Sequence, residues 1–168
     1  MPTAWVGIGS NIGDRLGYIR RALKLMAQVA DTEIDEVSSV YDTLPVGSIG
    51  QARFLNAVAR LSTTLEPLEL LRALLSIEDE CDRVRHGVWG PRTLDLDLVL
   101  YDDHEVVSEE LTLPHPRAKE RGFVLIPLAE LAPELVFPGE TETVSEWVTA
   151  LGEMAGRVQR AGDPPELE

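Results

Sequence analysis

Two carboxylates placed two residues apart are the first feature of this sequence that could do chemistry. Asp95 and Asp97 interrupt a leucine-rich run between Leu94 and Tyr101. Residues two apart on a β-strand point to the same face, so these side chains would repel each other unless a cation lay between them. Magnesium binds through one or two carboxylates together with substrate phosphates. The pair therefore predicts a magnesium site; the alternative is the solvated outer face of an edge strand.

Arginine side chains lie close to this pair in the sequence. Arg83 and Arg92 flank a loop that contains Trp89-Gly90-Pro91 and leads directly into the same strand. The planar guanidinium suits bidentate recognition of phosphate, and a loop of this kind can close over a substrate. We interpret Arg83 and Arg92 as polyphosphate ligands. For Arg117 and Lys119, in a later loop, ordinary surface charge is the favoured interpretation.

Several groups that could bind a flat heterocycle share the sequence with these charges. In the run 54–62 the apolar positions alternate, which leaves Phe54 and Asn56 on the face that carries the aspartates. Asn56 can donate and accept hydrogen bonds at once, as the amide edge of a heterocycle requires. Trp89 and Phe123 could stack on a ring, with core packing as the alternative. His115, between two prolines, could donate to a phosphate or be purely structural.

The surrounding pattern predicts the elements that hold these groups. Up to residue 101 we expect strand, helix, strand, strand, helix and strand, over 3–9, 14–30, 34–40, 54–62, 67–81 and 94–101. Two helices covering one face of a four-stranded antiparallel sheet is the economical way to bury their apolar stripes. This is an α+β, ferredoxin-like βαββαβ arrangement, and it leaves the other sheet face to carry a site.

The rest of the chain predicts a C-terminal extension of the same domain. Short strands are expected at 105–107 and 123–126, and an amphipathic helix at 144–158. We expect a single domain over 1–160, followed by a frayed tail over 161–168.

Charge and composition exclude several function classes. The 15 basic and 29 acidic residues give a net charge of −14, which argues against a nucleic-acid-binding protein. No apolar run is long enough to span a membrane, and no export signal is visible. Cys81 is the only cysteine, so no internal disulfide can form and we expect a cytoplasmic location. The chain also lacks a P-loop, a complete dinucleotide fingerprint, zinc-ligand spacing and a nucleophile elbow.

Five blocks in the chain resemble a known family when they are taken in order. They are GIGSNIGD at 7–14, VYDTLPVG at 40–47, QARFLNAV at 51–58, RVRHGVWGPRTLDLDLVLY at 83–101 and LPHPRAKERGFVLIPL at 113–128. Together they resemble the 6-hydroxymethyl-7,8-dihydropterin pyrophosphokinase family. The resemblance implies a ferredoxin-like fold and a magnesium-dependent transfer of pyrophosphate from ATP to the hydroxymethyl group of the pterin. It also implies that AMP is released and that the product serves folate biosynthesis.

The resemblance also implies roles for individual residues. The catalytic residues would be Arg83, Arg92, Asp95 and Asp97, with the two aspartates holding two Mg²⁺ ions. The pterin site would contain Thr43, Leu44, Pro45, Val46, Phe54, Asn56, Trp89, Asp95 and Phe123. The ATP site would contain Glu78, Arg83, Arg85, Trp89, Arg92, Leu98, Thr112, His115 and Arg121. The expected partners are these two small molecules, with no nucleic acid and no membrane, and the expected state is a monomer.

The sequence departs from the family pattern at three places. Phe54 replaces a frequent tyrosine, Gly50-Gln51-Ala52 replaces the commoner Asp-Gln-Pro, and Asp82 precedes Arg83 where glycine is common. The second of these changes bears on loop closure more than on chemistry. Two other functions remain as alternatives: a ferredoxin-like domain that binds a small molecule without turnover, and a two-metal nuclease that uses the same aspartate pair.

Overall fold

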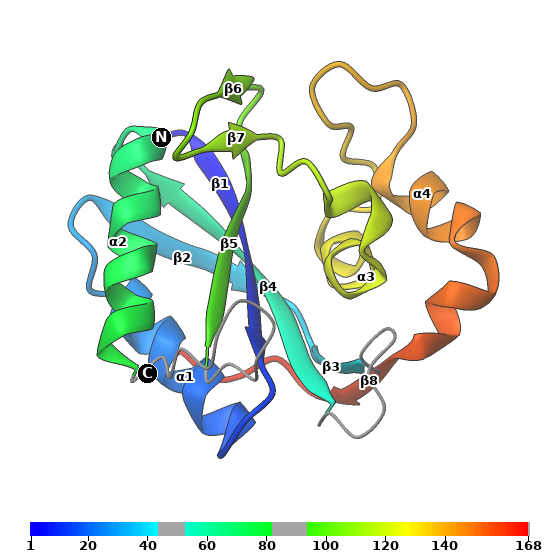
Figure 1. The fold of residues 1–168 in the computed structure, drawn as a ribbon, viewed down its shortest axis with the longest axis horizontal. Coiled ribbons are helices and arrows are strands. Elements are labelled where there is room, and N and C mark those ends of the chain that lie inside the picture. Colours follow the sequence, from blue (N-terminus) through cyan, green and yellow to red (C-terminus); the bar gives the residue numbers. More distant parts are fainter. Residues whose placement is uncertain (44–52, 82–93, 168) are drawn as a thin grey trace.

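The computed structural model describes residues 1–43, 53–81 and 94–167, and it shows an antiparallel sheet with helices packed on it (Figure 1). Within these residues the main sheet has the strand order β5-β1-β4-β3-β8, and β2 also pairs with β4. Its strands are β1 (Thr3–Ser10), β2 (Thr32–Val37), β3 (Val40–Thr43), β4 (Phe54–Thr63), β5 (Asp95–Tyr101) and β8 (Val158–Gly162). A separate small hairpin joins β6 (Val106–Val107) to β7 (Thr112–Leu113).

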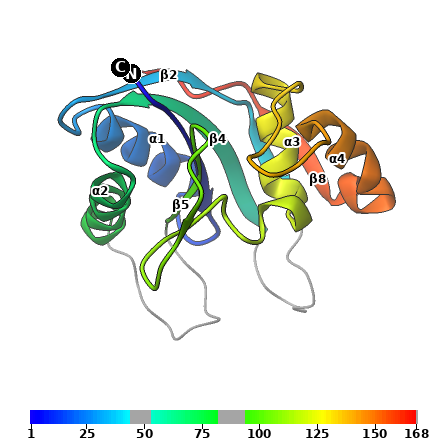
Figure 2. The same ribbon diagram turned by 90° about the horizontal axis from the view of Figure 1, so that it is seen from above.

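Helices α1 (Arg15–Met26) and α2 (Pro67–Glu80) cover one face of the sheet, as the sequence predicts (Figure 2). The α1 helix begins where the Asp14 side chain accepts a hydrogen bond from the Gly17 N–H at 3.0 Å. The α2 helix begins at a proline, whose missing N–H costs nothing at that position. The ferredoxin-like βαββαβ order is thereby confirmed.

A continuous apolar core lies between this face and the two helices. On the strands, Val6, Leu61 and Leu96 are buried in it, and α2 contributes its predicted stripe of Leu70, Leu74, Ile77 and the adjacent Cys81. The Cys81 side chain is fully buried, so its role is packing.

The C-terminal extension differs from expectation. Residues 123–126 belong to a helix, α3 (Gly122–Leu131), and not to a strand. The expected helix over 144–158 is instead α4 (Val144–Ala150), a 3₁₀ turn over Gly152–Arg157, and strand β8. Gly152 has a positive φ of 58°, at the point where the chain passes from α4 to the 3₁₀ segment. The extension packs α3 against the other face of the sheet, with α4 on the outer side of α3 (Figure 2), and Trp5, Val58 and Leu128 form a second core there.

Two irregularities distinguish the strands from their predicted form. The single strand expected over 34–40 is divided at Ser38 and Ser39, where the Ser38 hydroxyl accepts from the Val58 N–H at 2.9 Å. In β5, Val99 is an extra residue between the pairs Val6–Leu98 and Trp5–Leu100. This β-bulge reverses the alternation, so Leu100 packs in the second core and not beside Leu98 as predicted.

No helix within the described ranges is both long and apolar enough to cross a membrane.

Candidate active site

A strip of backbone without side chains forms the floor of the candidate site. Gly7 and Gly9 lie on β1, between β5 and β4, and on the sheet face opposite α1 and α2. Gly9 pairs with Asp95 on one side and with Asn56 on the other. A Cβ added at Gly9 would lie 2.9 Å from Asn56 Oδ1. From the sequence these glycines were used only as part of the block GIGSNIGD, although glycine at alternate positions of a strand signals a close approach of another group.

The two predicted metal ligands emerge together beside this strip. Asp95 and Asp97 are half-buried on the open face of β5, while Leu96 between them is buried on the other face. Arg121 approaches the pair, with its Nη1 3.5 Å from Asp97 Oδ2. The strand itself is held from the helix side, because the Leu96 N–H donates to Glu78 Oε2 at 2.8 Å. Asp95 and Asp97 thus lie on one face of β5, as the period of two predicts, and their role as metal ligands stays a prediction.

A pocket of about 320 Å³ adjoins the carboxylates. Six residues predicted for metal or ATP binding line it: Glu78, Asp95, Asp97, Leu98, Thr112 and His115. Glu109 and Glu110 also line it, and neither was predicted from the sequence as a site residue. The Glu110 carboxylate forms a surface ion pair with Arg72 at 3.2 Å. The pocket lies between α2, β5 and the β7 hairpin, so segments far apart in the sequence meet there.

His115 is held in one orientation by the backbone. The backbone N–H of His115 donates to the Val99 carbonyl at 2.9 Å, and the ring Nδ1 accepts from the backbone N–H of Arg117 at 3.2 Å. Burial lowers the pKa of His115, the Arg121 and Arg117 charges lower it further, and Asp97 opposes them. In the neutral ring the proton therefore resides on Nε2, which can donate a hydrogen bond.

The groups predicted to bind a heterocycle lie on the other side of the glycine strip. Asn56 Nδ2 donates to Thr43 Oγ1 at 2.9 Å, and both side chains are buried. Phe54 pairs with Thr43 across the two strands. Phe123 stands at the start of α3, packed against the second core, with the Arg121 guanidinium 5.5 Å from its ring centroid.

Other predicted site residues lie outside the described residues. They are Leu44, Pro45, Val46, Arg83, Arg85, Trp89 and Arg92. The departures at Gly50-Gln51-Ala52 and Asp82 lie there as well. Their roles stay predictions.

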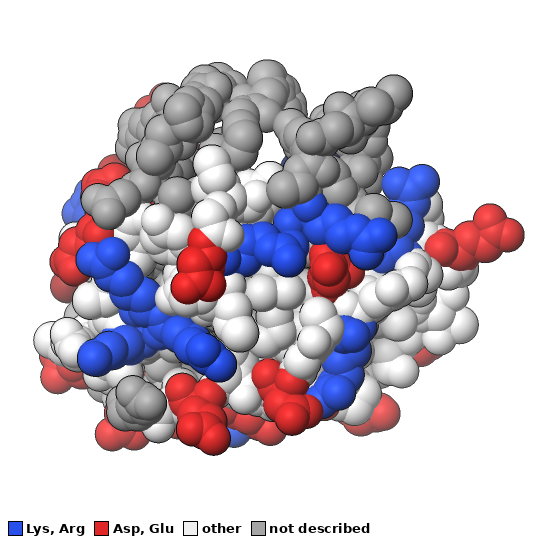
Figure 3. Space-filling model, turned by 90° about the horizontal axis from the view of Figure 1, so that it is seen from below, with Lys and Arg blue, Asp and Glu red and all other residues white. Residues whose placement is uncertain are grey.

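Lysine and arginine side chains gather on one face of the molecule (Figure 3). Arg15 and Arg53 both approach Asp42, at 3.7 and 4.0 Å, and Arg15 Nη1 donates to the Arg53 carbonyl at 2.7 Å. Asp42 immediately precedes Thr43, and Arg53 precedes Phe54. Despite a net charge of −14, the protein therefore holds cations next to the Thr43–Phe54 strand pair. Neither Arg15 nor Arg53 was predicted from the sequence as a site residue.

The residues present suit a magnesium–nucleotide complex. Within 1–43, 53–81 and 94–167, no group of three or more histidine, cysteine, aspartate and glutamate side chains could hold a metal ion by itself. Two neighbouring carboxylates beside an open pocket match a hard cation that takes its remaining ligands from phosphates and water. The donor set favours magnesium over zinc.

Comparison with known proteins identifies relatives along most of the chain. The sequence profile of 7,8-dihydro-6-hydroxymethylpterin-pyrophosphokinase (HPPK) matches residues 5–133. A *Bacillus subtilis* protein named 2-amino-4-hydroxy-6-hydroxymethyldihydropteridine pyrophosphokinase is 47% identical over 132 residues, 79% of each chain. A *Haemophilus influenzae* protein of the same name is 41% identical over 150 residues, 88% of this chain and 94% of its own.

Solved structures agree on the fold. A *Plasmodium falciparum* HPPK-DHPS structure has a TM-score of 0.76 and 14% identity, with 95% of this chain and 48% of that chain covered. An HPPK-DHPS structure in complex with substrates has a TM-score of 0.74 and 13% identity. The present chain spans about half of these longer chains. The profile and the curated relatives show that the chain belongs to the 7,8-dihydro-6-hydroxymethylpterin-pyrophosphokinase family.

Proposed function

We propose that the chain transfers a pyrophosphoryl group from ATP to the hydroxymethyl oxygen of 6-hydroxymethyl-7,8-dihydropterin and releases AMP. Family membership makes it a pyrophosphokinase of folate synthesis. The detailed reaction rests on one observation above all. Asp95 and Asp97 emerge between a pocket lined by predicted ATP-site residues and a strip bordered by Asn56.

The nucleotide side of the site has groups suited to a polyphosphate. The Nε2–H of neutral His115 can donate to a phosphate oxygen, and Arg121 supplies a permanent positive charge beside Asp97. Arg83, Arg85 and Arg92 would add further positive charge from the segment outside the described residues. Trp89 from that segment, with Glu78, Leu98 and Thr112 from the pocket, would complete the ATP site.

Asp95 and Asp97 would hold two Mg²⁺ ions together with the phosphates. When bound, magnesium neutralises phosphate charge and makes the substrate hydroxyl easier to deprotonate. The 3.5 Å contact of Arg121 with Asp97 keeps a cation beside this carboxylate.

The pterin side of the site depends on a fixed amide. The bond from Asn56 Nδ2 to Thr43 sets the plane of this amide, so Oδ1 and the second N–H have defined directions. The absence of a side chain at Gly9 leaves room next to Oδ1. Phe54 and Phe123 would stack on the ring, with Leu44, Pro45, Val46 and Trp89 contributed by the undescribed segments.

The reaction itself demands positioning and charge neutralisation. The hydroxymethyl oxygen attacks the β-phosphorus, the bond from this phosphorus to the α–β bridging oxygen breaks, and AMP leaves with that oxygen. Charge accumulates on the transferred group, and the arginines and the His115 N–H would offset it. Near-in-line placement of the two substrates accounts for much of the expected acceleration.

An assay for AMP release tests this function against its alternatives. The purified protein is incubated with ATP, Mg²⁺ and 6-hydroxymethyl-7,8-dihydropterin, and AMP and the pterin diphosphate are quantified by chromatography. Equal amounts of both products are expected, and none without the pterin. Binding of the pterin without AMP formation would favour a sensing domain, and magnesium-dependent cleavage of DNA or RNA would favour a nuclease. Cytoplasmic location and a monomeric state stay predictions.

A further inference from the structure

The C-terminal strand is part of the wall that carries Thr43. Residues 134–167 lie beyond the family match, which ends at residue 133. Nevertheless β8 pairs with all of β3, and Val158 lies opposite Thr43. Because β3 has only four residues, its position depends on both of its neighbours, β4 and β8.

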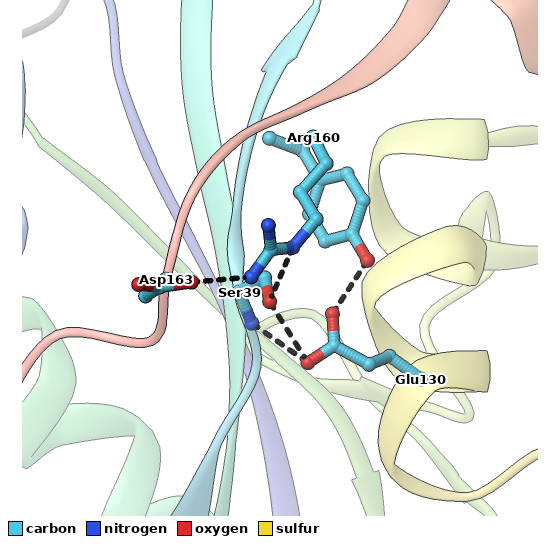
Figure 4. Close-up of polar contacts among 5 residues, drawn as sticks. Ser39, Glu130, Arg160 and Asp163 are labelled. Atoms are coloured by element: carbon cyan, nitrogen blue, oxygen red, sulfur yellow. Dashed lines mark hydrogen bonds and ion pairs between the residues drawn. The ribbon is translucent and has the colours of Figure 1, made fainter.

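A cluster of polar side chains, here called the β3 anchor, fixes the beginning of β3 (Figure 4). It consists of Ser39, Tyr41, Glu130 and Arg160. Glu130 Oε2 accepts from the Ser39 N–H at 2.9 Å and from the Ser39 hydroxyl at 3.2 Å. Glu130 Oε1 accepts from the Tyr41 hydroxyl at 2.5 Å. One carboxylate from α3 thus binds two residues at the start of β3.

Arg160 joins the same cluster from β8. Its Nε donates to the Ser39 hydroxyl at 3.1 Å, and its Nη2 donates to Asp163 Oδ1 at 2.6 Å (Figure 4). Burial and the Glu130 carboxylate raise the pKa of Tyr41 to about 12, so its hydroxyl stays protonated and continues to donate at neutral pH. The anchor therefore ties β3, β8 and α3 together through charge-assisted hydrogen bonds.

The anchor lies only one strand pair from the amide of the pterin site. Tyr41 pairs directly with Asn56 across β3 and β4, and Thr43 accepts the Asn56 hydrogen bond two residues further on. A one-residue slip of a strand turns every side chain to the other face. Loosening β3 would therefore withdraw Thr43 Oγ1 from Asn56.

The C-terminal segment also supports the second wall of this site. A Cβ at Gly122 would lie 3.4 Å from Leu151 Cδ1 and 3.4 Å from Val158 Cγ2, so both residues pack tightly against the start of α3. Phe123 follows directly, and Glu130 lies at the other end of this helix. The positions of Phe123 and of the Asn56 amide thus both depend on β3, β8 and α3.

We propose that the β3 anchor is a positioning device that holds Thr43, Asn56 and Phe123 in the geometry that binds the pterin. The inference rests on the proposed function. Because the pocket beside Asp95 and Asp97 is built from α2, β5 and the β7 hairpin, and none of the anchor residues lines it, we expect the anchor to affect pterin binding more than ATP binding.

Steady-state kinetics with each substrate varied in turn tests the inference. Glu130→Ala removes the acceptor of three hydrogen bonds and should raise the KM for the pterin about tenfold, with kcat and the KM for ATP changed less than about twofold. Glu130→Gln keeps an acceptor for Ser39 and should restore most of the affinity. Glu134→Ala is the matched control, because Glu134 is an exposed glutamate that lies four residues after Glu130, just beyond the end of α3.

A second measurement does not require turnover. The NMR signals of the Asn56 side-chain NH₂ should move and exchange faster with water in Glu130→Ala than in Glu134→Ala, without substrate. If Glu130→Ala fails to fold, Arg160→Ala is the milder test, with an expected rise of about threefold in pterin KM.

The outcomes separate the two ideas. A wild-type protein that forms no AMP refutes the proposed function, and the Asn56 signals then still decide whether the anchor positions the amide. A fully active wild type whose folded anchor variants keep the pterin KM and the Asn56 signals unchanged overturns the anchor, even if their melting temperature falls.

Discussion

The two faces of the central sheet are built from the same strands for different purposes. On the face under α1 and α2, Ala4, Val6 and Ile8 of β1 are all buried in a continuous apolar core. On the other face the same strand presents Trp5, then Gly7 and Gly9. The covered face carries apolar side chains that fill the core. The open face carries glycines, which leave space, and polar side chains beside them. Changes on the first should lower stability, and changes on the part of the second that α3 does not cover should lower turnover.

The largest effect is expected for Asp97→Ala, on the open face. Loss of a carboxylate that would hold magnesium should lower kcat at least about a thousandfold, because several kcal/mol of charge stabilisation are removed. The side chain is 39% exposed, so the fold and pterin binding should persist. Asp103→Ala, a neighbouring exposed aspartate, is the control for net charge. Near-normal turnover in Asp97→Ala would refute the metal assignment.

Leu61→Ala tests the covered face. Leu61 is fully buried under the helices, and its truncation should lower the free energy of unfolding by about 2–5 kcal/mol. Denaturant titration measures this loss, and both KM values of the folded variant should stay unchanged. Val107→Ala, at a position that is 90% exposed, should cost less than about 0.5 kcal/mol. A rise in only one of the two KM values of Leu61→Ala would contradict the expectation that changes on the covered face lower stability without affecting substrate binding.

Gly9→Ala and Gly7→Ala sharpen the comparison within the open face. A Cβ at Gly9 would meet Asn56 Oδ1 at 2.9 Å, whereas the nearest atom to a Cβ at Gly7 is Val99 Cγ2, in ordinary contact at 3.7 Å. Gly9→Ala should therefore lower the free energy of unfolding by about 1–3 kcal/mol and displace the Asn56 side chain. Calorimetric titration should show weaker pterin binding for Gly9→Ala, with a smaller change for Gly7→Ala. Equal affinities would show that the strip does not shape the pterin site.

The smallest effect concerns pH. The pKa of Tyr41 is raised from 10.0 to about 12, first by burial and then by Glu130. A raised folded-state pKa gives stability that is fully present below the unfolded pKa and is lost as the pH rises through the folded value. Between about pH 9 and pH 11 the protein should therefore lose at most about 1.4 kcal/mol through Tyr41. Tyr41→Phe should remove this part of the decline in denaturant titrations; an unchanged decline would contradict it.

Local patterns in the sequence predicted those features of the fold and site that depend on residues close together in the chain. The period of two placed Asp95 with Asp97, and Phe54 with Asn56, on one face, and the helical stripes of α1 and α2 gave the covered core. The aspartate pair and its neighbours could be predicted because a strand's alternation depends on few residues. The pterin, ATP and AMP assignments came from the resemblance and not from these patterns.

Contacts between distant segments could not be predicted in this way. The apolar run 123–126 fits a buried strand or a buried helix equally well, and only packing against the second core decides for α3. The pairing of β8 with β3 and the bond from Ser39 to Glu130, 91 residues apart, have no local signal. The glycine strip was missed because its function depends on Asn56, which lies on another strand.

The extra residue at Val99 reverses the face of the sheet on which the following side chains of β5 lie. Ahead of it, the strand points leucines at α2 and the carboxylates of Asp95 and Asp97 away from the helices; behind it, Leu100 faces α3 and Tyr101 returns to the helix side. Deletion of Val99 would restore a regular alternation, with Leu98 and Tyr101 still toward the helices and Leu100 still toward α3. The extra residue therefore adds a second apolar side chain to the second core without changing the face on which Asp95 and Asp97 lie, and Val99 should be the β5 residue whose deletion is tolerated best.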